Sequence, residues 1–317
     1  MEPYGIDEFD RQIIERLRED GRASLSAIGA EIGLSPDAVG TRLTRLTGDG
    51  VLRVIGLVHP ESLGYDSLGT VSLDYEGPAE LLLERIKGHA SVTFMAQTLG
   101  PASAVCEITA RNDAEFADVV TRDLATIPGV RVRDVWRHLS VLKWDSQARP
   151  RALSVTNVSQ RPLDEVDVAL LRELVVNPRA SYRELEAVIG QPYWIVRRRT
   201  QALFAAGVIH ASAMVDLLAT SNEVRAHLAI GLSGDWSEGM RQLCGVPGVA
   251  IVALTTGSSA ATAEIACPDS LAMAETIRRV SAIDCVRTVA SYLYSRILVL
   301  PMPWRFDAPA TLTWPPA

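Results

Sequence analysis

The chain has 317 residues, enough for about two domains that each bury a core of their own. With 48% hydrophobic and 22% charged residues, the composition is that of a soluble globular protein, and the net charge of −7 excludes a surface that is basic all over. A local basic helix is compatible with this charge, so nucleic acid stays among the candidate partners.

Three helices are predicted near the N-terminus. The first carries an apolar stripe over residues 13–17, and the second begins after Ser24, a good N-cap, and stops at Gly33. Ser35 can cap a third helix that has Pro36 in its first turn. Two short helices joined by a glycine turn of three or four residues are typical of a helix-turn-helix.

The third helix, which we expect to end at Gly50, presents a polar face suited to the major groove of DNA. Its N-terminal residues would reach base edges, and its arginines would reach guanine or phosphate. A solvated helix face without DNA contact is the alternative. The residues expected to contact DNA are Ser35, Asp37, Gly40, Thr41, Arg42, Thr44 and Arg45.

A βαββαβ module is predicted after the third helix. Its strands are 69–75, 92–99, 104–109 and 131–142, and its helices are 79–87 and 113–127. This order is ferredoxin-like. A sheet with helices on one face leaves the other face open. Two such sheets can bury their open faces against each other, so pairing of two modules is expected, here inside one chain.

The whole pattern recurs 157 residues later (164 minus 7) without a gap over roughly 140 residues, which indicates a tandem duplication. The matching segments include Asp7-Glu8-Phe9-Asp10 with Asp164-Glu165-Val166-Asp167, Arg22-Ala23-Ser24 with Arg179-Ala180-Ser181, and Glu107-Ile108 with Glu264-Ile265. The second βαββαβ module is expected at 226–232, 237–244, 250–256, 260–266, 269–283 and 286–300.

The second copy of the third helix differs from the first. Pro192 replaces the serine cap, and Arg197-Arg198-Arg199 form a basic run. Such residues suit phosphate contact better than base reading. A degenerate copy whose aromatic pair, Tyr193 and Trp194, packs internally is the alternative. The residues expected to contact DNA are Trp194, Arg197, Arg198, Arg199 and Gln201.

No catalytic or metal-binding constellation is visible, and no cofactor is expected. The five histidines are scattered, and neither a Gly-rich phosphate loop nor a nucleophile elbow occurs. Glycine and hydroxyl side chains instead recur in the loops between the middle strands. Each loop is either a plain hairpin turn or a ligand-facing loop, and the candidate effector-binding residues are Thr98, Gly100, Ser103, Thr255, Gly257, Ser258 and Ser259.

The cysteines and the N-terminus bear on location. Cys106, Cys244, Cys267 and Cys285 lack metal-ligand spacing, so we expect four buried hydrophobic residues, with pairing among the last three as the alternative. We expect no signal peptide in residues 1–10, and no apolar run reaches the ~18 residues that span a membrane. A cytoplasmic protein without membrane contact is expected.

The first copy resembles the Lrp/AsnC family of leucine-responsive transcriptional regulators, and its βαββαβ module is similar to that family's RAM domain. The residues that carry the resemblance are Asp10, Arg22-Ala23-Ser24, Ile32-Gly33-Leu34-Ser35-Pro36, Val39, Arg42-Leu43, Leu46 and Gly50-Val51-Leu52. The resemblance covers residues 7–143 and, more weakly, 164–300. It implies a regulator of transcription whose RAM modules pair and bind a small effector, often an amino acid. Family members commonly carry an aspartate after the loop glycine, which both loops here lack.

Sirohaem decarboxylases form a second branch of this architecture and also occur as fused pairs. In these enzymes the Val-Thr of the second strand is followed by His-Asn-Tyr. In this chain Val92-Thr93 is followed by Phe94-Met95-Ala96. We therefore expect a regulator and no enzyme. Such an enzyme and a metabolite sensor remain the alternatives.

The expected fold is α+β, with two copies of a winged or helix-turn-helix three-helix domain, each followed by a ferredoxin-like RAM domain. The expected partners are double-stranded DNA and a small-molecule effector, and each chain is expected to act as a pseudo-dimer within a homo-oligomer. The expected boundaries are 1–52 and 163–209 for the helical domains, 53–143 and 210–300 for the RAM domains, 144–162 for a polar linker and 301–317 for a proline-rich tail.

Overall fold

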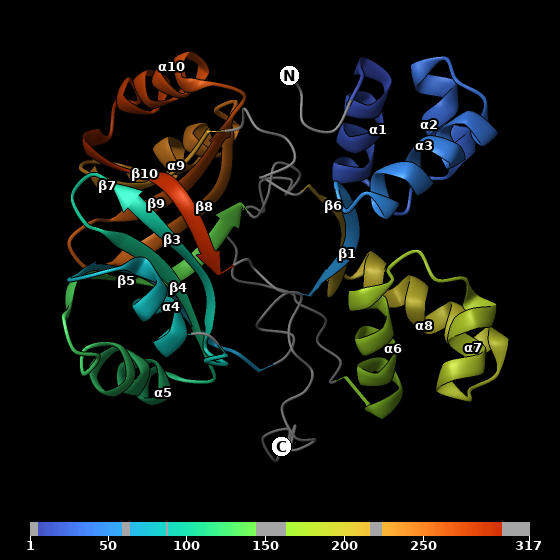
Figure 1. The fold of residues 1–317 in the computed structure, drawn as a ribbon, viewed down its shortest axis with the longest axis horizontal. Helices are drawn as coiled ribbons and strands as arrows, with labels where there is room; N and C mark the ends of the chain where they lie inside the picture. The colour runs from blue at the N-terminus through green and yellow to red at the C-terminus, as the bar shows by residue number, and fades with distance from the viewer. Residues whose placement is uncertain (1–5, 59–63, 87, 144–162, 216–223, 300–317) are drawn as a thin grey trace. The chain divides into compact units, whose positions relative to one another are not determined.

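The computed structural model describes residues 6–58, 64–86, 88–143, 163–215 and 224–299 (Figure 1). The linker expected at 144–162 and the tail expected at 301–317 lie outside these ranges. The described residues form two compact units. The first contains residues 6–58 and 163–215, and the second contains residues 64–143 and 224–299. Within these ranges, no helix has both the length and the apolar character needed to cross a membrane.

Three helices begin the first unit, and the caps of the second and third are the ones that the sequence predicts. They are α1 (Glu8–Glu19), α2 (Leu25–Ile32) and α3 (Pro36–Gly48). Ser24 and Ser35 each accept a hydrogen bond from a backbone N–H in the first turn of α2 and α3, which stabilises both helix starts. Gly33 ends α2 in the left-handed conformation, with φ 78°. The third helix ends at Gly48, two residues before the expected Gly50, which has φ 72° in the following turn.

Three further helices of the first unit repeat these bounds at the offset of 157 residues. They are α6 (Glu165–Val176), α7 (Tyr182–Ile189) and α8 (Tyr193–Ala205). Ser181 caps α7, and Gly190 ends it with φ 70°. The expected loss of the cap on α8 is confirmed, because Pro192 precedes this helix and no side chain of the N-cap position bonds to it.

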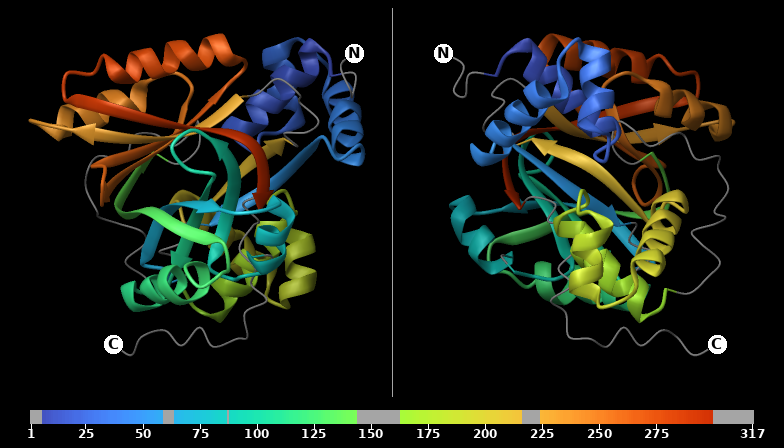
Figure 2. Two further views of the ribbon diagram at one scale, coloured as in Figure 1. Left: turned by 60° about the vertical axis from the view of Figure 1, so that its left-hand side comes forward. Right: turned by 90° about the vertical axis from the view of Figure 1, so that its right-hand side faces the viewer.

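A two-stranded antiparallel sheet joins the two sets of helices and was not predicted. It consists of β1 (Leu52–Val58) and β6 (Ile209–Val215), paired with Ile55 opposite Ser212. In the right-hand view of Figure 2 the two strands run side by side, with α1–α3 on one side and α6–α8 on the other. The strand that follows each set of helices therefore pairs with the strand that follows the other set.

Each strand also packs on a helix of the opposite set. A Cβ atom on Gly56 of β1 would lie 2.4 Å from the carbonyl oxygen of Leu174 in α6, so only glycine fits there. The backbone N–H of Gly21, just after α1, donates to the carbonyl oxygen of Ala211 in β6 at 2.9 Å. Two backbones can approach this closely only where side chains are absent, and the sheet therefore ties both sets of helices into one body.

A reciprocal pair of arginines strengthens the same contact. Arg179 donates to the carbonyl oxygens of Gly21 and Ala23 at 2.6 and 3.0 Å. Arg22, its counterpart at the 157 offset, donates to the carbonyl oxygen of Pro178, and its guanidinium lies 4.9 Å from the ring centroid of Phe204. The recurring Arg-Ala-Ser segment of the sequence thus marks the contact between the two sets of helices.

The second unit is an eight-stranded closed barrel made of two βαββαβ modules. The first module comprises β2 (Ser67–Tyr75), α4 (Ala79–Ile86), β3 (Val92–Leu99), β4 (Ala104–Ala110), α5 (Asp113–Asp118) and β5 (Val130–Lys143). The second comprises β7 (Val224–Leu232), α9 (Trp236–Gly245), β8 (Val249–Thr256), β9 (Ala261–Cys267), α10 (Ser270–Ser281) and β10 (Val286–Val299). The strand order is β10-β3-β4-β2-β5-β8-β9-β7, so β5 pairs with β8 and β10 pairs with β3. The modules are joined edge to edge, which the sequence did not indicate.

Two details of the modules differ from the expectation. The helix expected at 113–127 is α5 followed by a π-helical segment, Val119–Leu124. The last strands start at Val130 and Val286, which are 156 residues apart (286 minus 130), so the repeat is not free of gaps. The offset is already 156 at Leu124 and Val280, whose carbonyl oxygens accept from the N–H groups of Ile127 and Ile283, so the additional residue of the first copy lies in its π-helical segment.

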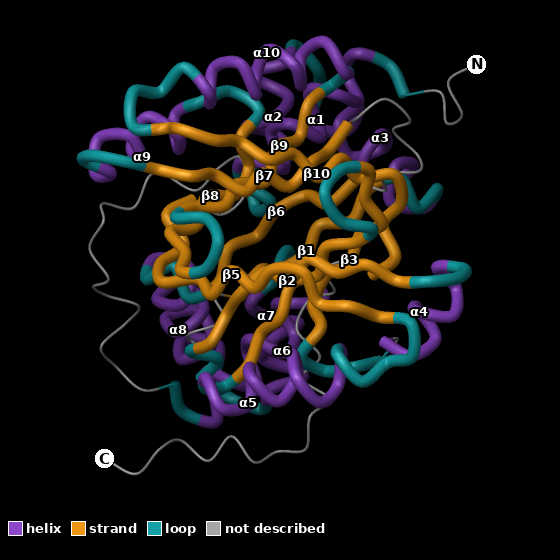
Figure 3. Tube along the Cα trace, turned by 90° about the vertical axis from the view of Figure 1, so that its left-hand side faces the viewer, coloured by secondary structure: helices purple, strands orange, loops and turns teal. Residues whose placement is uncertain are grey.

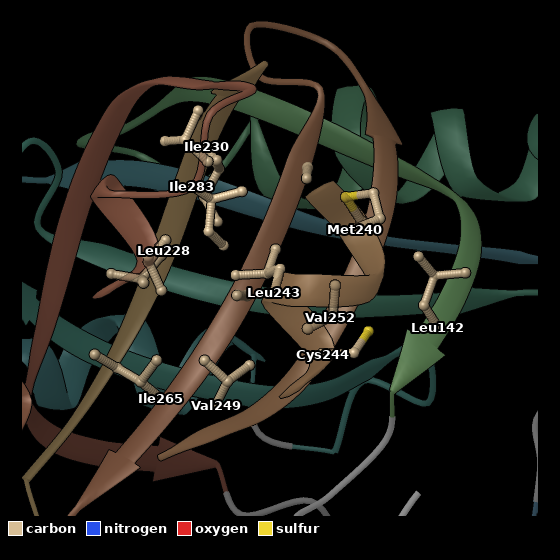
Figure 4. Close-up of a cluster of buried hydrophobic side chains, with 14 of the residues drawn as sticks. Leu142, Leu228, Ile230, Met240, Leu243, Cys244, Val249, Val252, Ile265 and Ile283 are labelled. Atoms are coloured by element: carbon tan, nitrogen blue, oxygen red, sulfur yellow. The ribbon is translucent and has the colours of Figure 1, made fainter. Parts of the chain in front are cut away.

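Apolar side chains fill the space between the barrel wall and the helices outside it, where α9 and α10 cover one module and α4 and α5 the other (Figure 3). Under α9 and α10, Leu228 and Ile265 from the strands meet Met240 and Leu243 from α9 (Figure 4). Leu142 of β5 joins this core although it belongs to the other module. The two modules therefore share core residues as well as strand edges.

Candidate nucleic-acid interface

The turn between α2 and α3 holds the two helices close together. A Cβ atom on Gly29 would lie 2.4 Å from the carbonyl oxygen of Leu34, and the Leu34 N–H donates to the carbonyl oxygen of Gly29 at 2.9 Å. A Cβ atom on Gly40 would lie 3.2 Å from a methyl group of Leu25. Glycine at both positions lets α3 lie against α2 with its other face outward.

The outward face of α3 is polar. Asp37, Thr41, Thr44 and Arg45 are exposed, whereas Gly40 is half-buried against α2. The hydroxyls of Thr41 and Thr44 donate to backbone carbonyl oxygens one turn earlier, both at 2.9 Å. The structure therefore gathers most of the predicted contact residues of α3 on one accessible face, while the hydroxyl of Ser35 caps the helix.

Arg42 lies in an ion-pair network with α1. Its guanidinium contacts Asp7 at 2.6 Å and Asp10 at 2.9 Å, and Arg45 also bonds to Asp10, which is fully buried. The backbone N–H of Asp10 and then the Arg42 guanidinium lower the pKa of Asp7, and the bond to Asp7 raises the pKa of Arg42. Arg42 therefore braces α3 against α1, whether or not it also contacts DNA.

The same brace occurs in the second set of helices. Arg199 of α8 contacts Asp164 at 2.5 Å and Asp167 at 3.1 Å, each at the 157 offset from its counterpart. The side chain of Arg199 is only 20% exposed. The sequence analysis grouped Arg199 with its basic neighbours and so missed that it forms ion pairs within the domain. The recurrence of both aspartates and the arginine at the same offset was a signal that could have indicated this.

The remaining predicted residues of α8 are exposed. Trp194 is 60% exposed, so it does not pack internally. The guanidinium of Arg198 lies over the Trp194 ring, 5.4 Å from its centroid, and Arg197 and Gln201 are also exposed. The structure thus separates Arg199 from the other members of the basic run.

The predicted effector loops contain buried threonines that hold each hairpin. Thr98 donates to the carbonyl oxygen of Ala102 at 2.6 Å, and Thr255 donates to that of Ser259 at 2.8 Å. These are the contacts of plain hairpin turns, and Ser103 and Ser259 are half-buried beside them.

Each loop also packs on the last strand of the other module. A Cβ atom on Gly100 would lie 2.5 Å from the carbonyl oxygen of Ser291, and one on Gly257 would lie 2.4 Å from that of Val135. The exposed Ser258 accepts a hydrogen bond from the indole N–H of Trp136 at 3.1 Å. Both loops therefore contact the module to which they do not belong.

Ionisable groups inside the barrel were missed from the sequence. Neighbours of Glu107 on β4 pack under the helices, so Glu107 itself points into the barrel. Burial, then the nearby Glu264, raises the pKa of Glu107 to about 8. Burial also lowers the pKa of His138 to about 4 and that of His227 to about 3. The recurrence of glutamate at 107 and 264 was the only sequence signal for this cluster.

The expectation for the cysteines is confirmed: all four are buried and unpaired. In the part of the chain that the structure describes, no three histidine, cysteine or acidic side chains are grouped in a way that could hold a metal ion.

Known proteins are similar to part of the chain. The AsnC-type helix-turn-helix domain family matches residues 6–47, which contain α1, α2 and nearly all of α3. An uncharacterised HTH-type transcriptional regulator of Pyrococcus abyssi is 30% identical over 142 residues, which are 44% of this chain and 89% of the relative. The HTH-type transcriptional regulator FL11 of the same organism is 32% identical over 131 residues, or 39% of this chain and 83% of the relative.

Solved structures of a siroheme decarboxylase are similar over nearly the whole length. The crystal structure of the siroheme decarboxylase NirDL has a TM-score of 0.56 and 18% identity, and the match covers 93% of each chain. A likeness at this identity shows a shared fold. The sequence matches, in contrast, extend over most of the length of two transcriptional regulators. The chain belongs to the Lrp/AsnC family of transcriptional regulators.

Proposed function

We propose that the chain acts in the cytoplasm as a transcriptional regulator that binds double-stranded DNA, with α3 in the major groove. The observation that carries this proposal is the close α2–turn–α3 packing at Gly29 and Gly40, in the segment that matches the AsnC-type helix-turn-helix family. This packing leaves the polar face of α3 free to meet base edges.

Within that face, Thr41, Thr44 and Arg45 are the proposed base-contacting residues, with Asp37 and Gly40 beside them. Arg45 keeps donor capacity for a guanine, since a guanidinium has five N–H groups and the bond to Asp10 uses one nitrogen. Arg42 contributes mainly by fixing the angle of α3 on α1.

The α7–turn–α8 segment is the proposed second helix-turn-helix, and the two βαββαβ modules are the proposed RAM domains. One chain would then provide both DNA-contacting helices of an ordinary dimer, because β1 and β6 join their helices inside the first unit. Two such helices meet successive major grooves about 34 Å apart. The tandem duplication is the simplest origin of this arrangement.

Two matched variants of α3 test the proposal. Thr41 and Thr47 are both exposed, and both donate to a backbone carbonyl oxygen of the preceding turn, at 2.9 and 2.8 Å. Genomic DNA fragments protected by the purified chain would first be sequenced to find a binding site. Thr41→Glu should then weaken binding to that site at least tenfold, or ~1.4 kcal/mol, because the carboxylate would face bases and phosphates. Thr47→Glu should bind as the wild type does.

Equal affinities for the two variants would show that α3 does not enter the groove. A wild-type chain that protects no duplex DNA at all would overturn the proposed function itself.

Effector control is a further part of the proposal. A small molecule such as an amino acid would bind at the loops after β3 and β8, where each loop contacts the other module through Gly100 or Gly257. A ligand at this place could change how the modules pair. Thermal unfolding with single amino acids should show a rise in Tm for the effector, and Ser103→Ala with Ser258→Ala should reduce that rise. An iron tetrapyrrole added to the same series would test the enzyme alternative, since its absorbance changes on binding.

Association of whole chains is also proposed, on surfaces other than the strand edges of the barrel, which are already paired with each other. Light scattering of the purified chain would measure it, and a mass of one chain at all concentrations would contradict it.

A further inference from the structure

The N-terminus of α8 is closed by a carboxylate. The backbone N–H of Tyr193, the first residue of the helix, donates to Oε1 of Glu186 in α7 at 2.9 Å. Glu186 stands at the position of Gly29, where the turn before α3 leaves no room for a side chain. The second turn is therefore built differently, and it places a negative charge where the N-terminus of α3 offers an N–H-rich, positive end.

Positive charge is instead displayed farther along α8. Arg197 and Arg198 are exposed, and neither forms an ion pair with any residue that the structure describes. Arg199 is excluded from this display because it is held by Asp164 and Asp167. Two arginines are thus available one turn beyond the closed helix start.

An aromatic side chain stands next to this charge. Trp194 is 60% exposed, and the guanidinium of Arg198 lies 5.4 Å from the centroid of its ring. A tryptophan left in water costs hydrophobic free energy unless a partner covers it, and the stacked guanidinium is held in place by the ring. The pair thus presents an apolar ring and a positive charge side by side.

The corresponding positions of α3 carry no such charge. Asp37, Gly40 and Thr41 take the places of Trp194, Arg197 and Arg198 at the 157 offset. The faces of the two helices therefore differ in charge by three units at these positions, from −1 on α3 to +2 on α8. A short polar face is suited to base edges, whereas exposed arginines on a helix with a closed N-terminus are suited to phosphates.

We propose that α8 grips the sugar-phosphate backbone of duplex DNA through Arg197 and Arg198, with Trp194 packed on the deoxyribose, and reads no bases. This inference rests on the proposed DNA binding of the chain. It assigns base recognition to α3 and sequence-independent affinity to α8. The DNA site would therefore have one half with a defined base sequence and one half without.

The test is the salt dependence of binding, measured with the full chain on its specific site and on a scrambled duplex. Removal of one protein–phosphate interaction reduces the slope of log Kobs against log salt by about 0.9. Arg197→Ala and Arg198→Ala should each lower the slope by that amount, and the double variant by about 1.8, equally on both duplexes. Arg172→Ala, an exposed arginine of α6, is the matched control and should leave the slope unchanged.

Two further variants separate the parts of the surface. Trp194→Ala should weaken binding several-fold on both duplexes and leave the salt slope as in the wild type, because it removes apolar contact and no charge. Glu186→Gln should strengthen binding to both duplexes, because it keeps an acceptor for the Tyr193 N–H and removes the negative charge. Circular dichroism of each variant would verify the helical content.

Three results would overturn the inference while wild-type DNA binding persists. An unchanged slope in the double variant would show that α8 does not touch DNA. Weaker binding confined to the specific site would show that α8 reads bases. Tighter binding of a single strand than of the duplex, abolished in Trp194→Ala, would show that the surface takes unpaired bases. Absence of any DNA binding by the wild type would instead be a failure of the proposed function.

Discussion

The two sets of three helices in the first unit share their support and differ in what they display. Both fasten the third helix to the first with an aspartate pair and an arginine, Asp7 and Asp10 with Arg42 in one and Asp164 and Asp167 with Arg199 in the other. The turns before the third helix share a left-handed glycine, Gly33 or Gly190, but differ at the position of Gly29 and Glu186, and the exposed faces differ as well. The brace is common to both sets although their surfaces differ, so we expect the fold of each set to depend on it.

The largest expected effect comes from breaking the shared brace. Asp10→Ala leaves Arg42 and Arg45 without their buried partner, and Asp167→Ala does the same to Arg199. Removal of one member of a buried ion pair costs about 3–5 kcal/mol, and we expect the lower end because the arginines are partly exposed. Thermal unfolding followed by circular dichroism would measure the destabilisation. Destabilisation of only one of the two variants would show that the two sets of helices do not depend equally on the brace.

The turns give the next largest effect and should separate the copies. Gly29→Ala places a methyl group 2.4 Å from the carbonyl oxygen of Leu34, so it should cost about 1–3 kcal/mol and weaken DNA binding by tilting α3. Glu186→Ala, at the equivalent position, removes only the bond to the Tyr193 N–H and should cost about 1 kcal/mol. Urea unfolding would measure both, and equal costs would show that the two turns are more alike than their contacts indicate.

The barrel halves differ in a comparable way, and pH reveals it. Glu107 and Glu264 both lie in the barrel wall, but Arg225 stands 3.6 Å from Glu264, whereas the equivalent position beside Glu107 is Leu68. The pKa of Glu107 is raised from 4.5 to about 8, so between pH 6.5 and 8 the folded chain keeps a proton that the unfolded chain has lost. Stability should therefore fall by about 2 kcal/mol as the pH rises over this window.

Glu107→Gln should abolish most of that fall, measured as the change in unfolding free energy with pH, and Glu264→Gln should change it less because Arg225 balances its charge. Below pH 6.5 the net sign reverses, because the two buried histidines outweigh Glu107, whose own contribution keeps its sign down to pH 4.5. The lowered pKa values of His138 and His227 mean that the unfolded chain takes up protons first, so stability should decrease as the pH falls from 6.5 towards 4. An identical profile for wild type and Glu107→Gln would contradict this assignment.

The smallest expected effect concerns the caps. Ser35→Ala removes the bond to the Ala38 N–H and should cost about 1 kcal/mol. Pro192→Ser offers α8 the same cap, but the N–H that it would bind, that of Ile195, already donates to the carbonyl oxygen of Pro192 at 2.9 Å, so a gain well under 1 kcal/mol is expected. Urea unfolding of both variants would compare them, and a gain from Pro192→Ser as large as the cost of Ser35→Ala would show that the backbone bond of the Ile195 N–H is no substitute for a serine cap.

Local signals in the sequence predicted local structure well. Ser24, Gly33 and Ser35 indicated the helix limits, because caps and left-handed turns depend on neighbouring residues alone. The strand Leu52–Val58 was missed because it is short and apolar residues outnumber the polar ones, so it lacks a clear period of two. The strand becomes stable only through its pairing with Ile209–Val215, more than 150 residues away in sequence.

The candidate interface was predictable in outline and not in detail. The exposed face of α3 followed from helical periodicity, whereas the roles of Arg42 and Arg199 depend on carboxylates of another helix. Edge pairing of β5 with β8 was equally invisible, because a strand pattern does not specify its neighbours. Interactions between residues far apart in sequence could be predicted only where both partners recur at the same offset, as the aspartates and arginines of the brace do.

Because the barrel closes within one chain, the pairing of its two modules does not weaken when the protein is dilute. Pairing of β5 with β8 and of β10 with β3 is intramolecular, so its equilibrium does not depend on how many copies of the protein a cell contains. Two separate subunits at nanomolar concentration would dissociate if their affinity were only micromolar, whereas a covalent connection holds both halves at an effective concentration of the order of millimolar. The assembled form therefore persists at very low expression, and the ratio of the two unlike halves is fixed at one to one.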